Sequence, residues 1–169
     1  MSAREEVLAA LRDLGISYHL LEHEAVFHME DCEGIAEPEG AVYCKNAFLT
    51  TKSRRIYALC VMRPEARFQT SDVSHQAGTP RLSFADEAAM EALLGTYPGA
   101  VSPLGLLFDR EGRVRLLVDE ELRTVPRLAF HPCDNRATVL LDAKDFFDIF
   151  LPAIRHAPQF VTIHDPAEN

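Results

Sequence analysis

Residues 42–62 have the sequence VYCKNAFLTTKSRRIYALCVM, and this stretch decides the fold. It predicts two strands, 42–51 and 56–62, joined by a short polar and basic turn. The second strand is a continuous apolar run, which is typical of a strand covered on both faces of a sheet. The sequence therefore predicts that a buried sheet forms around this pair.

A cation stands at the start of the first of these strands. Lys45 and Asn46 place an ammonium group and a carboxamide where the chain enters the core. An unpaired buried charge is costly, so the lysine needs a partner, and an anionic ligand would be one. The alternative is a lysine that extends its ammonium group to solvent or pairs with one of the chain's carboxylates. Taken alone, the spacing favours this alternative, because isolated lysines are usually solvated.

Helices and further strands are predicted on both sides of this pair. Ser2 and Glu5 form a capping box ahead of a helix that Gly15 ends. Further strands are predicted at 16–21, 101–108, 114–118, 128–130 and 137–141, and further helices at 29–35, at 86–94 and from Asp142 onward. Residues 109–112 are typical of a hairpin turn between their neighbouring strands. This mixture indicates an α+β fold with a curved, mostly β core, in a single domain spanning residues 1–169.

Composition excludes several classes of protein. The chain has 169 residues, of which 47% are hydrophobic, but no apolar run approaches the roughly 18 residues of a membrane span. The N-terminus lacks the layout of a signal peptide. Four cysteines are scattered without a CxxC pair, which indicates reduced thiols in a cytoplasmic protein: Cys32, Cys44, Cys60 and Cys133. His19 and His23 would lie ~13 Å apart on a strand, too far for one metal ion.

The charge is unevenly distributed along the chain. The net charge is −9, yet residues 45–81 contain seven basic and two acidic side chains, which gives this segment a local charge of +5. A basic zone on an acidic body suits a polyanion that docks at one place. The alternative is a solvated surface whose charges pair with one another.

Two polar segments interrupt the later strands. Residues 98–105 place two Gly/Pro pairs around Ser102, which leaves backbone N–H and C=O groups open to a small polar ligand. Residues 130–138 form a polar turn between two apolar strands. The alternatives are an ordinary loop and a turn in which Asp134 and Asn135 bond to their own backbone. Ser102 lacks the GxSxG surroundings of a nucleophilic serine.

In their order along the chain, these segments resemble the motifs of the YbaK/prolyl-tRNA editing family of aminoacyl-tRNA deacylases. Lys45 and Asn46 are similar to the family's lysine motif. The GxxxP loop of the family is matched by Gly99, Ala100, Val101, Ser102 and Pro103. The HPxxNxxT-like segment of its stand-alone members, the alanyl-tRNA(Pro) deacylases, is matched by His131, Asn135 and Thr138. The resemblance runs from about His23 to the last helix.

The resemblance implies a mixed, barrel-like β-sheet flanked by helices. It also implies hydrolysis of the ester that joins a wrong amino acid to the terminal adenosine of tRNA(Pro). Lys45 takes the central role, close to the ester and the terminal phosphate, and the loop 99–103 lines the aminoacyl pocket with backbone groups. Asn46, His131, Asn135 and Thr138 line or support the pocket. The family is thought to use a ribose hydroxyl of the substrate to orient water, and neither a cofactor nor a metal is predicted.

The tRNA-binding surface is inferred from charge rather than from a motif. Four basic residues are predicted to contact acceptor-stem phosphates: Lys52, Arg54, Arg55 and Arg81. The expected substrate is tRNA(Pro) charged with alanine, acted on in trans, and prolyl-tRNA synthetase is a further candidate partner. The alternatives are a deacylase for cysteine or serine, a non-catalytic module that binds tRNA or a synthetase, and a small-metabolite-binding barrel. Departures from the family pattern at Ala47, Cys133 and Arg136 leave the amino acid open.

Overall fold

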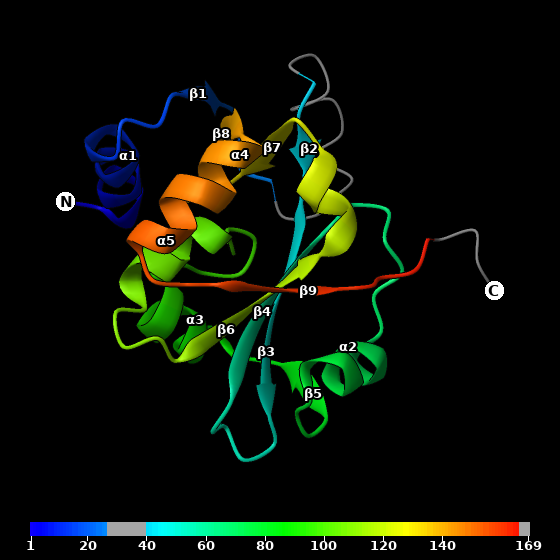
Figure 1. The fold of residues 1–169 in the computed structure, drawn as a ribbon. Coiled ribbons are helices and arrows are strands. Elements are labelled where there is room, and N and C mark those ends of the chain that lie inside the picture. The colour runs from blue at the N-terminus through cyan, green and yellow to red at the C-terminus, as the bar shows by residue number, and fades with distance from the viewer. Residues whose placement is uncertain (27–39, 166–169) are drawn as a thin grey trace.

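The computed structural model describes residues 1–26 and 40–165, which form two mixed sheets with helices outside them (Figure 1). The first sheet has the order β1-β8-β7-β2, with β1 at Tyr18–Glu22, β2 at Val42–Tyr43, β7 at Arg127–Phe130 and β8 at Ala137–Asp142. The second has the order β5-β3-β4-β6-β9, with β3 at Lys45–Thr51, β4 at Tyr57–Met62, β5 at Leu82–Phe84, β6 at Val114–Asp119 and β9 at Pro158–Val161. The predicted α+β class is confirmed, although the described strands form two sheets and not a closed barrel. The helix predicted at 29–35 lies outside the described residues.

The strand predicted at 42–51 is divided between the two sheets. Its first part, β2, pairs in parallel with β7, whereas β3 pairs antiparallel with β4 and places Lys45 opposite Met62. Between the two parts, the N–H of Cys44 donates to a carbonyl of β7 at 3.3 Å. The chain therefore crosses from one sheet to the other just before Lys45, and this crossing positions the predicted site at the junction of the sheets.

Strand β4 is buried along its whole length, as its apolar sequence predicts. Because side chains alternate across a strand, Leu59 and Val61 enter the main core, while Ala58 and Cys60 enter a smaller cluster on the opposite face. Helix α2 (Thr70–Ala77) covers that smaller cluster and contributes Val73 to it. The second sheet is thus packed on both sides.

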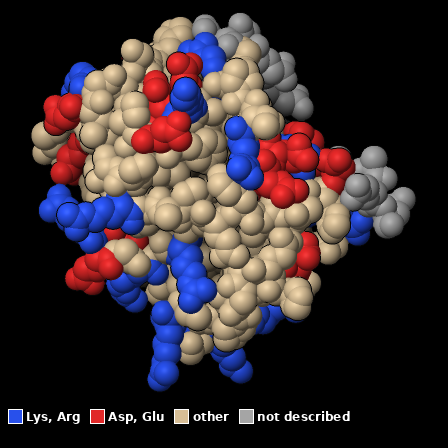
Figure 2. Space-filling view, viewed as in Figure 1, with Lys and Arg blue, Asp and Glu red and all other residues tan. Residues whose placement is uncertain are grey.

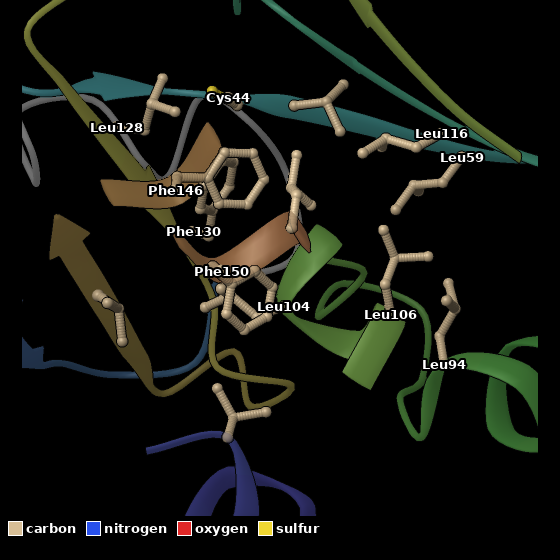
Figure 3. Close-up of a cluster of buried hydrophobic side chains, with 14 of the residues drawn as sticks. Cys44, Leu59, Leu94, Leu104, Leu106, Leu116, Leu128, Phe130, Phe146 and Phe150 are labelled. Atoms are coloured by element: carbon tan, nitrogen blue, oxygen red, sulfur yellow. The ribbon is translucent and has the colours of Figure 1, made fainter. Parts of the chain in front are cut away.

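The C-terminal helix anchors the main core with phenylalanines (Figure 3). It consists of α4 (Ala143–Asp145), the π-helical turn η5 (Phe146–Phe150) and α5 (Leu151–Ala153). The rings of Phe130 and Phe146 lie 5.0 Å apart, and those of Phe146 and Phe150 lie 5.9 Å apart. The helix predicted from Asp142 is confirmed, and it fixes the first sheet against the rest of the core.

The strand predicted at 101–108 is wrong, because this segment forms the 3-10 helix η3 (Pro103–Phe108). Ser102 caps the helix by accepting the N–H of Leu104 at 3.1 Å, and Pro103 has the fixed φ that suits a first helical position. The segment 109–112 is therefore a turn from a helix into β6 and not a hairpin. The remaining described helices are α1 (Ala3–Asp13), α3 (Glu87–Leu94) and η4 (Glu120–Thr124).

The described residues contain neither a membrane-spanning helix nor a cluster of metal-binding side chains. None of their helices is long and apolar enough to cross a membrane. Within the same ranges, no group of three or more His, Cys, Asp or Glu side chains is placed to hold a metal ion.

Candidate functional site

A cavity of about 280 Å³ opens where the two sheets meet. Its walls come from β2, the start of β3, α3 and the loop that precedes η3. Five residues that the sequence predicts as site residues line it together: Lys45, Asn46, Gly99, Val101 and His131. The fold therefore brings all three predicted motifs to one place.

Lys45 is half-buried in this cavity. Its ammonium group donates to the backbone carbonyl of Ala66 at 3.2 Å, and no carboxylate in the described part of the chain lies within ion-pair distance of it. An ammonium group has three N–H donors, so two are left for a ligand. The described structure thus provides a cation that is held in position but not neutralised.

The side-chain amide of Asn46 donates hydrogen bonds through its nitrogen but accepts none from the described residues through its oxygen. The Nδ2 group donates to the carbonyls of Cys44 at 3.4 Å and Val101 at 3.2 Å, which ties the loop before η3 to β3. A carbonyl oxygen can only accept a hydrogen bond, so the Nδ2 atom must face these two carbonyls and the Oδ1 atom must face away from them. The Oδ1 atom is buried, and no described residue donates a hydrogen bond to it. A buried acceptor without a donor is unfavourable, so Oδ1 of Asn46 is a polar atom that the described residues leave unsatisfied beside the cavity.

His131 is a buried, neutral histidine in the cavity wall. Its Nδ1 lies 2.7 Å from the carbonyl oxygen of Ala137, so Nδ1 carries the proton, and Nε2 accepts from the hydroxyl of Tyr43. Burial lowers the pKa of His131, in agreement with an uncharged ring. Because both nitrogens are engaged, His131 positions the Tyr43 ring and has no free lone pair to act as a base.

Comparison with known proteins shows the family of this chain. A family model described as the aminoacyl-tRNA editing domain matches residues 23–149, which is most of the chain. The chain belongs to the aminoacyl-tRNA editing domain family.

Relatives of this editing domain match nearly its whole length. It is 34% identical over 145 residues to the prolyl-tRNA editing protein ProX of Acetoanaerobium sticklandii, covering 86% of this chain and 88% of that protein. It is 31% identical over 157 residues to prolyl-tRNA synthetase associated domain-containing protein 1 of Danio rerio, covering 92% and 84%. A solved structure of a proposed trans-editing enzyme for prolyl-tRNA synthetase superposes with a TM-score of 0.73 over 98% of both chains. At 17% sequence identity, that last likeness shows the fold alone.

Five other predicted site residues of the editing domain lie behind the cavity wall: Ala100, Ser102, Pro103, Asn135 and Thr138. All five are buried, and their polar groups bond within the protein. The amide of Asn135 donates to the carbonyl of Val26 at 2.9 Å, and the hydroxyl of Thr138 contacts Nε2 of His23 at 2.8 Å. Asn135 therefore holds Val26 in the wall.

The cysteine in the cavity is not poised as a nucleophile. Cys44 is buried, its Sγ–H donates to the carbonyl of Val42 at 3.7 Å, and burial raises the pKa of the thiol. The thiolate is the nucleophilic form of cysteine, and a raised pKa keeps it scarce near neutral pH. Cys44 is therefore held as a thiol and is not activated as a nucleophile.

The apolar part of the cavity escaped sequence reasoning. Val26, Tyr43, Phe84 and Met90 line it together with Phe48. These residues come from four separate segments and match no motif of their own, although Tyr43 and Phe48 flank the lysine motif at Lys45 and Asn46. No signal in the sequence brings them together, and the exposure of Phe84 is a property of the folded chain.

Two of the four predicted tRNA-binding cations line a second cavity of about 220 Å³. Lys52 and Arg54 line this cavity, and both are exposed together with Arg55 and Arg81. Figure 2 shows Lys and Arg side chains gathered at the end of the molecule where the β3–β4 turn lies in Figure 1. Arg54 pairs with the exposed carboxylate of Asp86 at 3.5 Å.

Not every cation of the basic segment is available to a polyanion. Arg63 donates to the buried carboxylate of Asp119 at 2.7 Å, and it also pairs with Asp165 and donates to the carbonyl of Ile163. These contacts tie β4, β6 and the segment after β9 together. Arg63 therefore serves the fold, and the positive surface is smaller than the sequence count indicates.

Proposed function

We propose that this editing domain hydrolyses, in trans, the ester between alanine and the terminal adenosine of mischarged tRNA(Pro). Family membership and the relative named as a prolyl-tRNA editing protein support tRNA(Pro) as the substrate. The observation that carries the proposal is the half-buried Lys45, which lines the cavity and whose ammonium group lacks an ion-pair partner among the described residues. An aminoacyl ester supplies the complement of this cation, a carbonyl oxygen that gains negative charge when water attacks.

Hydrolysis of an aminoacyl ester does not require a strong nucleophile from the protein. An aminoacyl ester is already activated, so positioning of the ester and stabilisation of the oxyanion account for most of the required catalysis. The two remaining N–H donors of Lys45 can stabilise the oxyanion that forms when water attacks. Water is the nucleophile, in agreement with the protonated Cys44 and the engaged nitrogens of His131. No cofactor takes part in the proposed reaction.

Selection against proline follows from the walls of the cavity. The apolar side chains of Val26, Phe48 and Met90 line the cavity together with Gly99. Additional CH₂ groups contribute only ~0.8 kcal/mol each by attraction, so a larger pocket would bind proline better than alanine. Steric exclusion is therefore the mechanism by which correctly charged tRNA(Pro) is spared.

The proposal extends to partner and location. A relative is named as a prolyl-tRNA synthetase associated protein, and this name supports prolyl-tRNA synthetase as a partner that delivers the substrate. The reaction belongs where tRNA is charged, so the proposed location is the cytoplasm.

Deacylation assays with a lysine variant test the proposal. The wild-type protein is expected to release alanine from tRNA(Pro) and to leave prolyl-tRNA(Pro) intact. Lys45→Ala is expected to lower kcat/KM about 100- to 1,000-fold, the usual effect of removing one oxyanion donor. The exposed Lys144→Ala serves as the matched control and should retain full activity.

Charging tRNA(Pro) with cysteine, serine and proline as well as alanine separates the alternatives. Faster release of cysteine or serine would reassign the amino acid. An absence of hydrolysis for all four would leave only a binding module, and equal activity of wild type and Lys45→Ala would refute the role of the lysine.

A further inference from the structure

Phe84 is an aromatic side chain held in solvent. It is 68% exposed, more than any other large hydrophobic residue in the described ranges except the terminal Met1. It is not a loosely held loop residue, because β5 pairs it with Leu49 of β3 and the ring packs edge-on against Phe68, with centroids 6.1 Å apart. The ring is thus rigidly supported from below while its surface remains open.

Phe84 lies between the two cavities and lines both of them. On one side is the cavity that contains Lys45, where the proposed function places the aminoacyl ester. On the other side is the cavity lined by Lys52 and Arg54, whose one described carboxylate is Asp86. An apolar ring therefore separates an ester-binding site from a cationic site.

This order of groups matches the covalent order of a single-stranded 3′ end. From the ester, such a strand continues to a ribose that carries a flat base, and then to an anionic phosphate. Proteins that hold single strands combine aromatic platforms for the bases with cations for the backbone. The hydroxyl of Ser83 in the second cavity adds a hydrogen-bond donor of the kind that contacts phosphate oxygens.

We propose that Phe84 is the stacking platform for the terminal adenine of the tRNA, with the preceding backbone phosphate in the cavity lined by Lys52 and Arg54. The inference rests on the proposed function for the position of the ester. It adds a base contact and a path for the backbone to that function. Phe84 acts in this proposal as a binding residue, and the ester chemistry remains with Lys45.

Binding of an uncharged acceptor-stem hairpin tests the stacking in the absence of any hydrolysis. Two hairpins are compared, one with the terminal adenine and one with an abasic terminal nucleotide, against wild type, Phe84→Leu and Phe84→Trp. For wild type, loss of the base is expected to weaken binding about fivefold to a hundredfold. For Phe84→Leu, which keeps an apolar side chain but no aromatic face, loss of the base should cost little further affinity, and Phe84→Trp should behave as wild type does.

The exposed Ile149→Ala is the matched control and should leave both affinities unchanged. Equal affinity of wild type for the two hairpins would overturn the stacking proposal. The proposal would also be overturned if the losses of binding affinity caused by Phe84→Leu and by removal of the base were simply additive. A side chain and a base that are in contact must show coupling between the two changes. Coupling between Phe84 and the base in a protein that deacylates none of the charged tRNAs would support the stacking and refute the proposed function. Deacylation without such coupling would support the proposed function and refute the stacking.

Discussion

His131 is a histidine whose neutral form the fold requires. Its Nδ1–H donates to Ala137 and its Nε2 accepts from Tyr43, so a second proton would remove the acceptor that holds the tyrosine. Burial lowers the pKa of His131 in the folded state. In the unfolded chain the ring takes up a proton below about pH 6.5, the ordinary pKa of histidine, whereas in the folded state it does so only at a lower pH. The contribution of His131 to stability is therefore complete above that pH and decreases as the pH falls below it.

This linkage predicts a pH-dependent mutational effect. His131→Asn should reduce the free energy of unfolding most at pH 8, and the difference from wild type should shrink as the pH falls from about 6.5 to 5. Urea unfolding across this range measures the difference at each pH. The same substitution at the exposed His75 of α2 is the control and should show no such trend. A difference for His131→Asn that stays constant with pH would contradict the prediction.

The contact between α3 and η3 depends on a glycine. A Cβ atom added at Gly105 would lie 2.5 Å from the backbone carbonyl oxygen of Leu94, the last residue of α3, and 3.4 Å from the sulfur of Cys133. The closest atom is backbone, so the two elements would have to move apart. The cavity loop that Asn46 ties to β3 leads directly into η3, so this movement would reach the site.

Gly105→Ala is therefore expected to destabilise the protein by about 1–3 kcal/mol, the usual cost of overpacking, and to lower deacylation. Gly78→Ala at the end of α2 is a matched control. Its added methyl group meets nothing within 4 Å, so its only cost is the backbone strain of a non-glycine residue at a φ of 70°. Thermal unfolding should show a larger loss for Gly105→Ala than for Gly78→Ala. A loss that is equal or smaller would mean that the two elements can separate freely.

The molecule as a whole is acidic, with a net charge of −9, and the proposed docking surface for the polyanionic tRNA is the group of exposed cations around the β3–β4 turn. Reversing Arg54 and Arg55 to glutamate is expected to weaken binding of tRNA(Pro) and to reduce its dependence on salt. Each lost phosphate contact should lower the slope of log affinity against log salt by about one. Titrations at several salt concentrations measure the slope. The double reversal of the exposed Arg110 and Arg115 to glutamate changes the net charge by the same amount and is the control. Equal slopes for wild type and the double variant would show that the tRNA docks on another surface of the protein.

Local patterns in the sequence were sufficient for elements whose signals lie within a few neighbouring residues. The cap at Ser2, the apolar run of β4 and the phenylalanines of the last helix each predicted an element that the structure contains. The same reasoning mistook residues 101–108 for a strand, because a buried apolar run can adopt either structure and the cap at Ser102 outweighed the run. The charge count for residues 45–81 likewise included Arg63, whose partners lie far away in the chain.

The sequence by itself determined the α+β class, the strand pair around Lys45 and the three motifs of the editing family, because each depends on short-range order along the chain. Only the tertiary structure decided which motif residues face the cavity and which stand behind its wall. It also placed Phe84 between two cavities and left Lys45 without an ion-pair partner in the described part of the chain. The physical reason is that contacts between segments distant in sequence set which side chains are buried and which charges are paired. These segments meet where the chain crosses from one sheet to the other at Cys44.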